Sequence, residues 1–123
     1  MNLDEFRREM LAYREAVDRE AEALKDSYHA LEQLRALYRK FDTGERAMAD
    51  QVLTEWLQSE DESVRFDAQA LIDDFKIRSA LPALKKLVVR LASNNAVGAL
   101  HELQLVNRII ADLPPAETSN SKS

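Results

Sequence analysis

The chain has no cysteine and only two glycines and three prolines among its 123 residues. Without cysteine it can form neither a disulfide framework nor a thiolate metal site, which suits a reducing compartment such as the cytoplasm. So few glycines and prolines leave little of the turn chemistry that β-hairpins require. Good helix formers such as Ala, Leu, Glu and Arg predominate instead, so the composition predicts an all-α protein.

Targeting signals and long apolar runs are also missing. The N-terminal stretch "MNLDEFRREM" has acids where a signal peptide needs a basic start and an apolar run. No apolar segment reaches the length of about 18 residues that a transmembrane helix needs. We therefore expect no membrane partner and a cytoplasmic location.

Apolar residues recur at 3-4 spacing from residue 3 to residue 41, and only Glu20 and Ser27 break the heptad. Asp26 or Ser27 is a candidate N-cap at the second break, which favours two helices, Leu3 to Lys25 and Ser27 to Phe41. The alternative is one continuous helix, which could pair with a second copy as a coiled coil.

Four more helices are predicted after this N-terminal pair. Thr43 is a plausible cap for a helix over Glu45 to Gln58. Ser59 and Glu62 then fit the S-x-x-E capping box of a helix that ends at Phe75. The predicted buried positions of that helix are Val64, Ala68, Leu71, Ile72 and Phe75.

The C-terminal pair follows, with Ser79 as a cap, Pro82 in the first turn and a last helix over Ala96 to Leu113. The predicted buried positions of the last helix are Leu100, Leu103, Val106, Ile109, Ile110 and Leu113. We expect one helical domain over residues 1–113, made of the pair 1–41 and two units, 45–75 and 79–113. Residues 114–123 are predicted to be a disordered tail.

The two units show weak internal repetition, because a shift of about 34 residues superposes Ala49 on Ala83, Leu53 on Leu87 and Leu57 on Leu91. The stretch "DESVRFDAQALIDDF" followed by "SALPALKKL" resembles the HEAT repeat. The resemblance is carried by Asp61, Val64, Arg65, Ala68 and Leu71, then by Ala80, Pro82, Leu84 and Leu87. The second unit departs from the pattern, with Asn94 or Asn95 in place of the acid and no arginine after it.

The resemblance implies a short HEAT-like α-solenoid of about six helices, in which antiparallel pairs stack and the inner helices form a protein-binding surface. It also implies that Asp61 and Arg65 bridge successive repeats by charge-assisted hydrogen bonds. In size and character the whole chain is similar to bacterial immunity proteins that neutralise toxins.

Charge is distributed unevenly along the chain. Residues 42–75 hold ten acids and two bases, a net charge of −8, whereas residues 76–123 hold three acids and seven bases, a net charge of +4. Such a field steers association with a partner of opposite charge. The alternative is that these charges only keep the exposed helix surfaces hydrated and do not indicate a binding partner.

The candidate binding residues lie on the acidic helix that ends at Phe75. A helical wheel centred on Ala68 places one set of residues on the outward side, namely Glu62, Phe66, Asp67, Ala70, Asp73 and Asp74. Phe66 lies off the apolar stripe, so it is a candidate hot spot with an acidic rim. The sequence leaves open whether Phe66 instead packs under the N-terminal helices.

Catalytic and metal-binding patterns are too sparse for an enzyme. His29 with Glu32, and the dipeptide His101-Glu102, are isolated pairs that cannot fill a coordination sphere. The sequence has no Gly-rich phosphate loop and no G-x-S-x-G motif. We therefore expect no catalytic residue, metal or cofactor.

The basic residues Lys85, Lys86 and Arg90 form too small a patch to favour a nucleic-acid partner. The sequence thus predicts a non-enzymatic protein-binding module, and within that class an immunity protein that blocks a basic toxin. The alternative is a structural or adaptor subunit that forms homo-oligomers through residues 3–41.

Overall fold

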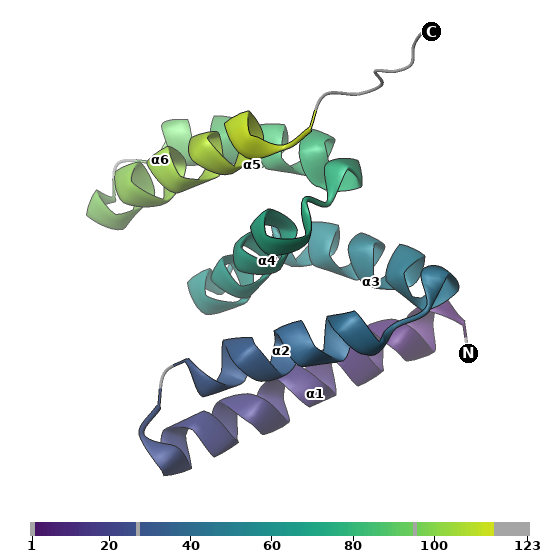
Figure 1. The fold of residues 1–123 in the computed structure, drawn as a ribbon. Coiled ribbons are helices and arrows are strands. Elements are labelled where there is room, and N and C mark those ends of the chain that lie inside the picture. The colour runs from purple at the N-terminus through teal and green to yellow at the C-terminus, as the bar shows by residue number, and fades with distance from the viewer. Residues whose placement is uncertain (1, 27, 95, 115–123) are drawn as a thin grey trace, which may run out of the picture. The chain divides into compact units, whose positions relative to one another are not determined.

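The computed structural model describes residues 2–26, 28–94 and 96–114. Within these residues the chain forms six α-helices, one short 3-10 helix and no strand (Figure 1). The predicted all-α class with six helices is confirmed. The predicted tail beyond residue 114 and the predicted roles of Ser27 and Asn95 lie outside the described residues.

The helices in chain order are α1 (Leu3–Leu24), α2 (His29–Lys40), α3 (Thr43–Trp56), α4 (Glu62–Phe75), the 3-10 helix η1 (Arg78–Ala80), α5 (Leu81–Ala92) and α6 (Val97–Asp112). Contacts divide the chain into two compact units, Met1–Val52 and Leu53–Ser123. The sequence predicted one domain, and the division falls inside α3. We call Met1–Val52 unit 1 and Leu53–Ser123 unit 2. These two parts differ from the predicted HEAT-like units 45–75 and 79–113.

In unit 1, α1 and α2 run antiparallel and pack against each other (Figure 1). Asn2 and Glu5 form a capping box that starts α1, and Lys25 ends it in the left-handed conformation with φ 55°. Two helices rather than one are therefore confirmed. Asp26 is not a side-chain cap of α2, because its Oδ1 accepts a hydrogen bond from the N–H of Tyr28, the residue before that helix.

The first turn of α3 lies at the other end of unit 1. Asp42 Oδ1 accepts from the N–H of Glu45 at 2.8 Å, and Glu45 Oε1 accepts from the N–H of Asp42 at 2.9 Å. This reciprocal capping box corrects the predicted cap, since Thr43 is the first residue of the helix. Aspartate is at least as good an N-cap as threonine, which is why Asp42 can take this role beside Thr43.

A buried tyrosine connects α2 to α3 within unit 1. The hydroxyl of Tyr38 donates to Asp50 Oδ1 at 2.6 Å, and the guanidinium of Arg46 lies 5.1 Å from the centre of the Tyr38 ring. Burial raises the pKa of Asp50, although the hydrogen bond from Tyr38 and the charge of Arg46 act in the opposite direction. The pKa of Tyr38 is raised as well, by its burial and then by Asp50.

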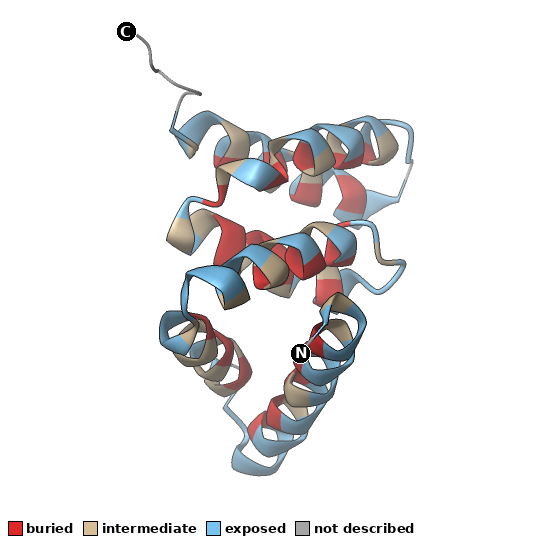
Figure 2. Cartoon of the chain, turned by 90° about the vertical axis from the view of Figure 1, so that its right-hand side faces the viewer, coloured by how far each residue is buried: buried red, intermediate tan, exposed pale blue. Residues whose placement is uncertain are grey.

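In unit 2, α5 and α6 form a second antiparallel pair, and α4 packs against α6 (Figure 1). Pro82 lies in the first turn of α5, as predicted. The predicted cap Ser79 is wrong, because it lies inside η1 and the N-cap of α5 is Ala80. Both helices carry buried residues on one side, drawn in red in Figure 2.

The buried side of α6 differs from the predicted one. Leu100 was predicted to be buried but is 62% exposed, and Leu103, Ile110 and Leu113 are only half-buried. The buried residues of α6 are Ala99, Glu102, Val106 and Ile109. The physical reason is that Glu102 turns inward to meet basic and amide side chains of α4, which rotates Leu100 toward solvent.

The start of α4 also differs in detail. Its N-cap is Asp61, whose Oδ1 accepts from the N–H of Ser63 at 2.9 Å, so the predicted capping box of Ser59 and Glu62 is wrong. Ser59 Oγ instead accepts from the N–H of Asp61, outside the helix. The predicted core positions Val64, Ala68, Leu71 and Ile72 are buried, and Phe75 is half-buried.

Trp56, the last residue of α3, is buried. Among the described residues, no helix combines the length and the apolar character needed to cross a bilayer.

Candidate protein-binding face

The solvent-facing side of α4 carries the residues that the sequence singled out for binding. Phe66 is 51% exposed, and Glu62 and Asp74 are exposed as well. Asp67, Ala70 and Asp73 are half-buried. We call this set of six residues the α4 face.

Helical geometry explains why Phe66 points outward. Successive residues of an α-helix are rotated by about 100°, so a residue two positions from Val64 and from Ala68 faces away from both. Glu62, Phe66, Ala70 and Asp73 follow one another at spacings of four and three, which places them along one stripe. Asp67 and Asp74, seven residues apart, flank this stripe on one side.

Glu62 has a second role at the start of α6. Its Oε2 would lie 3.9 Å from a Cβ atom added at Gly98, in the first turn of α6. The N-cap of α6, Ala96, makes no side-chain capping hydrogen bond. A carboxylate near a helix N-terminus complements the helix dipole, and Glu62 occupies such a position beside α6.

Asp73 pairs with Lys76, whose Nζ lies 3.2 Å from Asp73 Oδ1. Both side chains are more than a third exposed, and a surface pair of this kind contributes little to stability. A partner with its own basic group therefore competes for Asp73 at small energetic cost.

A buried ionic network lies under the α4 face. Arg65 Nε and Nη2 donate to the two carboxylate oxygens of Glu102 at 2.8 and 2.9 Å, and Gln69 Nε2 donates to Glu102 Oε2 at 2.7 Å. The Arg65 and Glu102 side chains are only 11% and 8% exposed. This bidentate geometry is the strong form of an ion pair, and it fixes α4 against α6.

Electrostatics in this network favour the charged state of the acid. Burial by itself raises the pKa of Glu102, but hydrogen bonds from Arg65 and Gln69, together with the charge of Arg65, hold it below its usual value. Gln69 Oε1 is buried with no hydrogen-bond partner. The Gln69 amide therefore donates to Glu102 through Nε2 while its own oxygen accepts no hydrogen bond.

Asp61 and Arg65 were predicted to act together between repeats, but in the structure they have different partners. Asp61 accepts hydrogen bonds from the N–H and the Oγ of Ser63, so its side chain caps its own helix. Arg65 reaches the next helix pair, where its acid is Glu102. Sequence reasoning missed Glu102 and Gln69. A signal was present, because Glu102 interrupts the apolar stripe three residues after Ala99 and four before Val106.

Two arginines also hold the connection between α3 and α4. Arg65 Nη1 donates to the carbonyls of Ser59 and Glu60 at 2.9 and 3.2 Å, and Arg90 Nη1 donates to the carbonyl of Gln58 at 3.0 Å. The sequence placed Arg90 in a basic patch with Lys85 and Lys86. In the structure its guanidinium instead forms hydrogen bonds within unit 2.

The histidines and the acidic side chains outside the α4 face are the other candidate metal ligands. Within the part of the chain that the structure describes, no group of three His, Cys, Asp or Glu side chains is arranged to hold a metal ion. His29 Nε2 lies 2.8 Å from Glu20 of α1, whereas the sequence had placed His29 beside Glu32. His101 is exposed.

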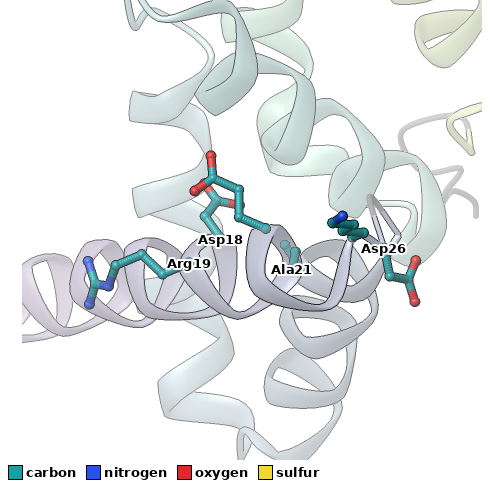
Figure 3. A pocket seen from close by; sticks show the side chains of 7 residues that line it. Asp18, Arg19, Ala21 and Asp26 are labelled. Atoms are coloured by element: carbon teal, nitrogen blue, oxygen red, sulfur yellow. The ribbon is translucent and has the colours of Figure 1, made fainter.

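A wide, open hollow of about 640 Å³ lies at the end of α1, where α2 begins. Its lining includes Asp18, Arg19 and Asp26, whose side chains point in different directions (Figure 3).

Comparison of the chain with protein-family models, with curated proteins and with solved structures gave no match.

Proposed function

We propose that the chain is a non-enzymatic protein-binding module whose α4 face engages a basic surface of a protein partner. The observation that carries this proposal is the 51% exposure of Phe66 on a helix whose core positions are filled by other residues. Aromatic residues that lose their contact with water in a complex dominate binding energy, and a charged rim sets specificity and association rate. The α4 face has an exposed aromatic residue, Phe66, and acidic residues around it.

Preorganisation of this face supports the proposal. Arg65 and Gln69 tie α4 to Glu102 of α6, and Asp61 caps its first turn. A helix held in this way loses little conformational entropy when a partner binds, so more of the contact energy appears as affinity.

The charge of the chain selects the kind of partner. The net charge of −8 over residues 42–75 attracts a basic surface and repels an acidic one. Within this class we propose a cytoplasmic inhibitor that blocks a basic toxin, on a HEAT-like arrangement of helix pairs. The HEAT-like pattern of residues 61–87, the small size of the chain and its acidity support this more specific proposal.

Self-association through the N-terminal helices is the alternative function. Leu24 and Tyr28 are 63% and 73% exposed, and they offer some apolar surface at that end of unit 1. The seam that a coiled coil would use is already occupied, however. Phe6, Met10 and Val17 of α1 are buried, as are Leu34 and Tyr38 of α2, with which α1 packs. This favours the protein-binding proposal.

The test is affinity capture from native lysate by the tagged chain, comparing wild type with Phe66→Ala/Asp73→Lys. A matched control is Val89→Ala/Asp112→Lys, which removes an exposed apolar side chain and reverses one acid away from the α4 face. We expect one basic protein bound by wild type and control but lost from the α4-face variant.

Two results would contradict the proposal. Equal loss from both variants would show that the α4 face is not the contact. Failure of the wild type to capture a basic partner, with a mass in light scattering that stays oligomeric on dilution, would favour self-association.

A further inference from the structure

Unit 1 contains a small pocket of about 150 Å³ between α1, α2 and the first turn of α3. Three aromatic rings contribute to its lining, those of Phe6, Tyr13 and Phe41, together with two aliphatic side chains. Two carboxylates, Glu9 and Glu45, complete it. The lining that the structure describes thus combines apolar walls with negative charge and includes no basic side chain.

The aromatic rings favour a cation. The ring centres of Phe6 and Phe41 lie 5.1 Å apart with 54° between their planes, so the two rings do not stack face to face. Aromatic faces carry negative electrostatic potential and attract ammonium and guanidinium groups within about 6 Å of the ring centre. The walls of the pocket can therefore contact both an apolar chain and the positive group at its end.

The two carboxylates are available to different extents. Glu9 is exposed on α1, three residues after Phe6 and four before Tyr13, which places it at the edge of the pocket. Glu45 is half-buried, and its Oε1 accepts from the N–H of Asp42 in the capping box of α3. That hydrogen bond fixes the Glu45 side chain beside the pocket and leaves Oε2 outside the capping box.

The size of the pocket limits its occupant. Pockets for drug-sized ligands begin at about 300 Å³, so a volume of about 150 Å³ suits a group no larger than one amino-acid side chain. We propose that this pocket binds an alkylammonium group on an apolar stem, the chemistry shared by a lysine side chain and a free aliphatic amine. It lies in unit 1, so the proposal does not depend on the α4 face.

The test is an NMR titration of the full chain, labelled with nitrogen-15, with n-butylammonium and with n-butanol as its neutral analogue. We expect saturable shifts of the amide signals of Tyr13 and Leu37, with the cation binding about tenfold more tightly than the alcohol. Glu9→Gln/Glu45→Gln should abolish that preference. Glutamine also serves in a capping box, so α3 keeps its cap.

The control variant is Glu15→Gln/Glu22→Gln, which removes the same charge from exposed positions of α1 outside the pocket. It should retain the preference for the cation. Equal affinity for cation and alcohol, shifts confined to other residues, or equal loss in both variants would each overturn the proposal.

Two further ligands distinguish the sources of the amine. Stronger binding by Nα-acetyl-lysine methylamide than by 1,4-diaminobutane would identify a lysine of a protein as the occupant. The reverse order would identify a free polyamine.

Discussion

Arg65 of α4 and Glu102 of α6 meet through two hydrogen bonds of 2.8 and 2.9 Å, although 37 residues separate them in the chain. The pair is buried, and it joins the α4 face to the C-terminal helix pair. Removing one member of such a pair destabilises a protein strongly, because it leaves the other charge buried without a partner.

Glu102→Gln should therefore destabilise the protein strongly. The substitution leaves the Arg65 guanidinium buried without its anion, a change that typically costs about 3–5 kcal/mol. Urea unfolding followed by circular dichroism measures the loss. Glu15→Gln, at an exposed position of α1, is the control and should change stability by less than about 0.5 kcal/mol. Similar values for the two variants would show that the pair contributes nothing net.

Stability should also depend on acid pH through Glu102. Its pKa is lower in the folded chain than in the unfolded one, so its contribution is fully present above the usual carboxyl pKa. The contribution is lost as pH falls below about 4.5 and through the folded-state pKa. We expect a steeper decrease of the urea midpoint over this range for wild type than for Glu102→Gln. Parallel curves would contradict the assignment.

Leu71→Ala and Phe66→Ala should differ in their effect on stability. Leu71 is 1% exposed, and removing it from the core of unit 2 should cost about 2–5 kcal/mol. Phe66 is half exposed, so its replacement should shift thermal melting much less than that of Leu71. A comparable decrease in Tm for both variants would place Phe66 in a core and would remove the main support for the α4 face.

The first turn of α3 provides a test of the corrected cap. Asp42→Ala removes the side chain that accepts from Glu45 N–H and should cost about 1 kcal/mol. Thr43→Ala at the first helical position should have a much smaller effect, since alanine is the better helix former. Chemical denaturation of the two variants decides between the caps, and a larger effect at Thr43 would restore the cap predicted from the sequence.

The apolar period of the sequence was sufficient to predict the number of helices and most of the core. Val64, Ala68, Leu71 and Ile72 are buried because a helix that repeats every 3.6 residues brings them to one side. The same geometry placed Phe66 off the apolar stripe but left open whether another helix covers it, and the structure shows it 51% exposed. The spacing of apolar residues thus predicted the features that depend on a single helix, namely which of its residues lie on the buried side.

What the sequence did not predict depends on contacts between helices or on competing caps. The buried side of α6 was wrong because Glu102 is drawn inward by Arg65, and no local pattern gives a partner in another helix. The predicted starts of α3 and α4 were wrong because aspartates near Thr43 and Ser59 compete for the same role and form the actual caps. Asp, Ser and Thr have similar preferences for the N-cap position, so propensity alone does not show which of several adjacent residues forms the cap.

The connection between α3 and α4 is short, polar and near the surface, which are the properties of a segment that proteases cut first. Here the guanidinium groups of Arg65 and Arg90 hold its carbonyl oxygens from two different helices. Cleavage requires the backbone to unfold locally into an extended form, and that step must first break these hydrogen bonds. Glu60 in this turn and Glu62 at the start of α4 should therefore resist a glutamate-specific protease for as long as unit 2 stays folded.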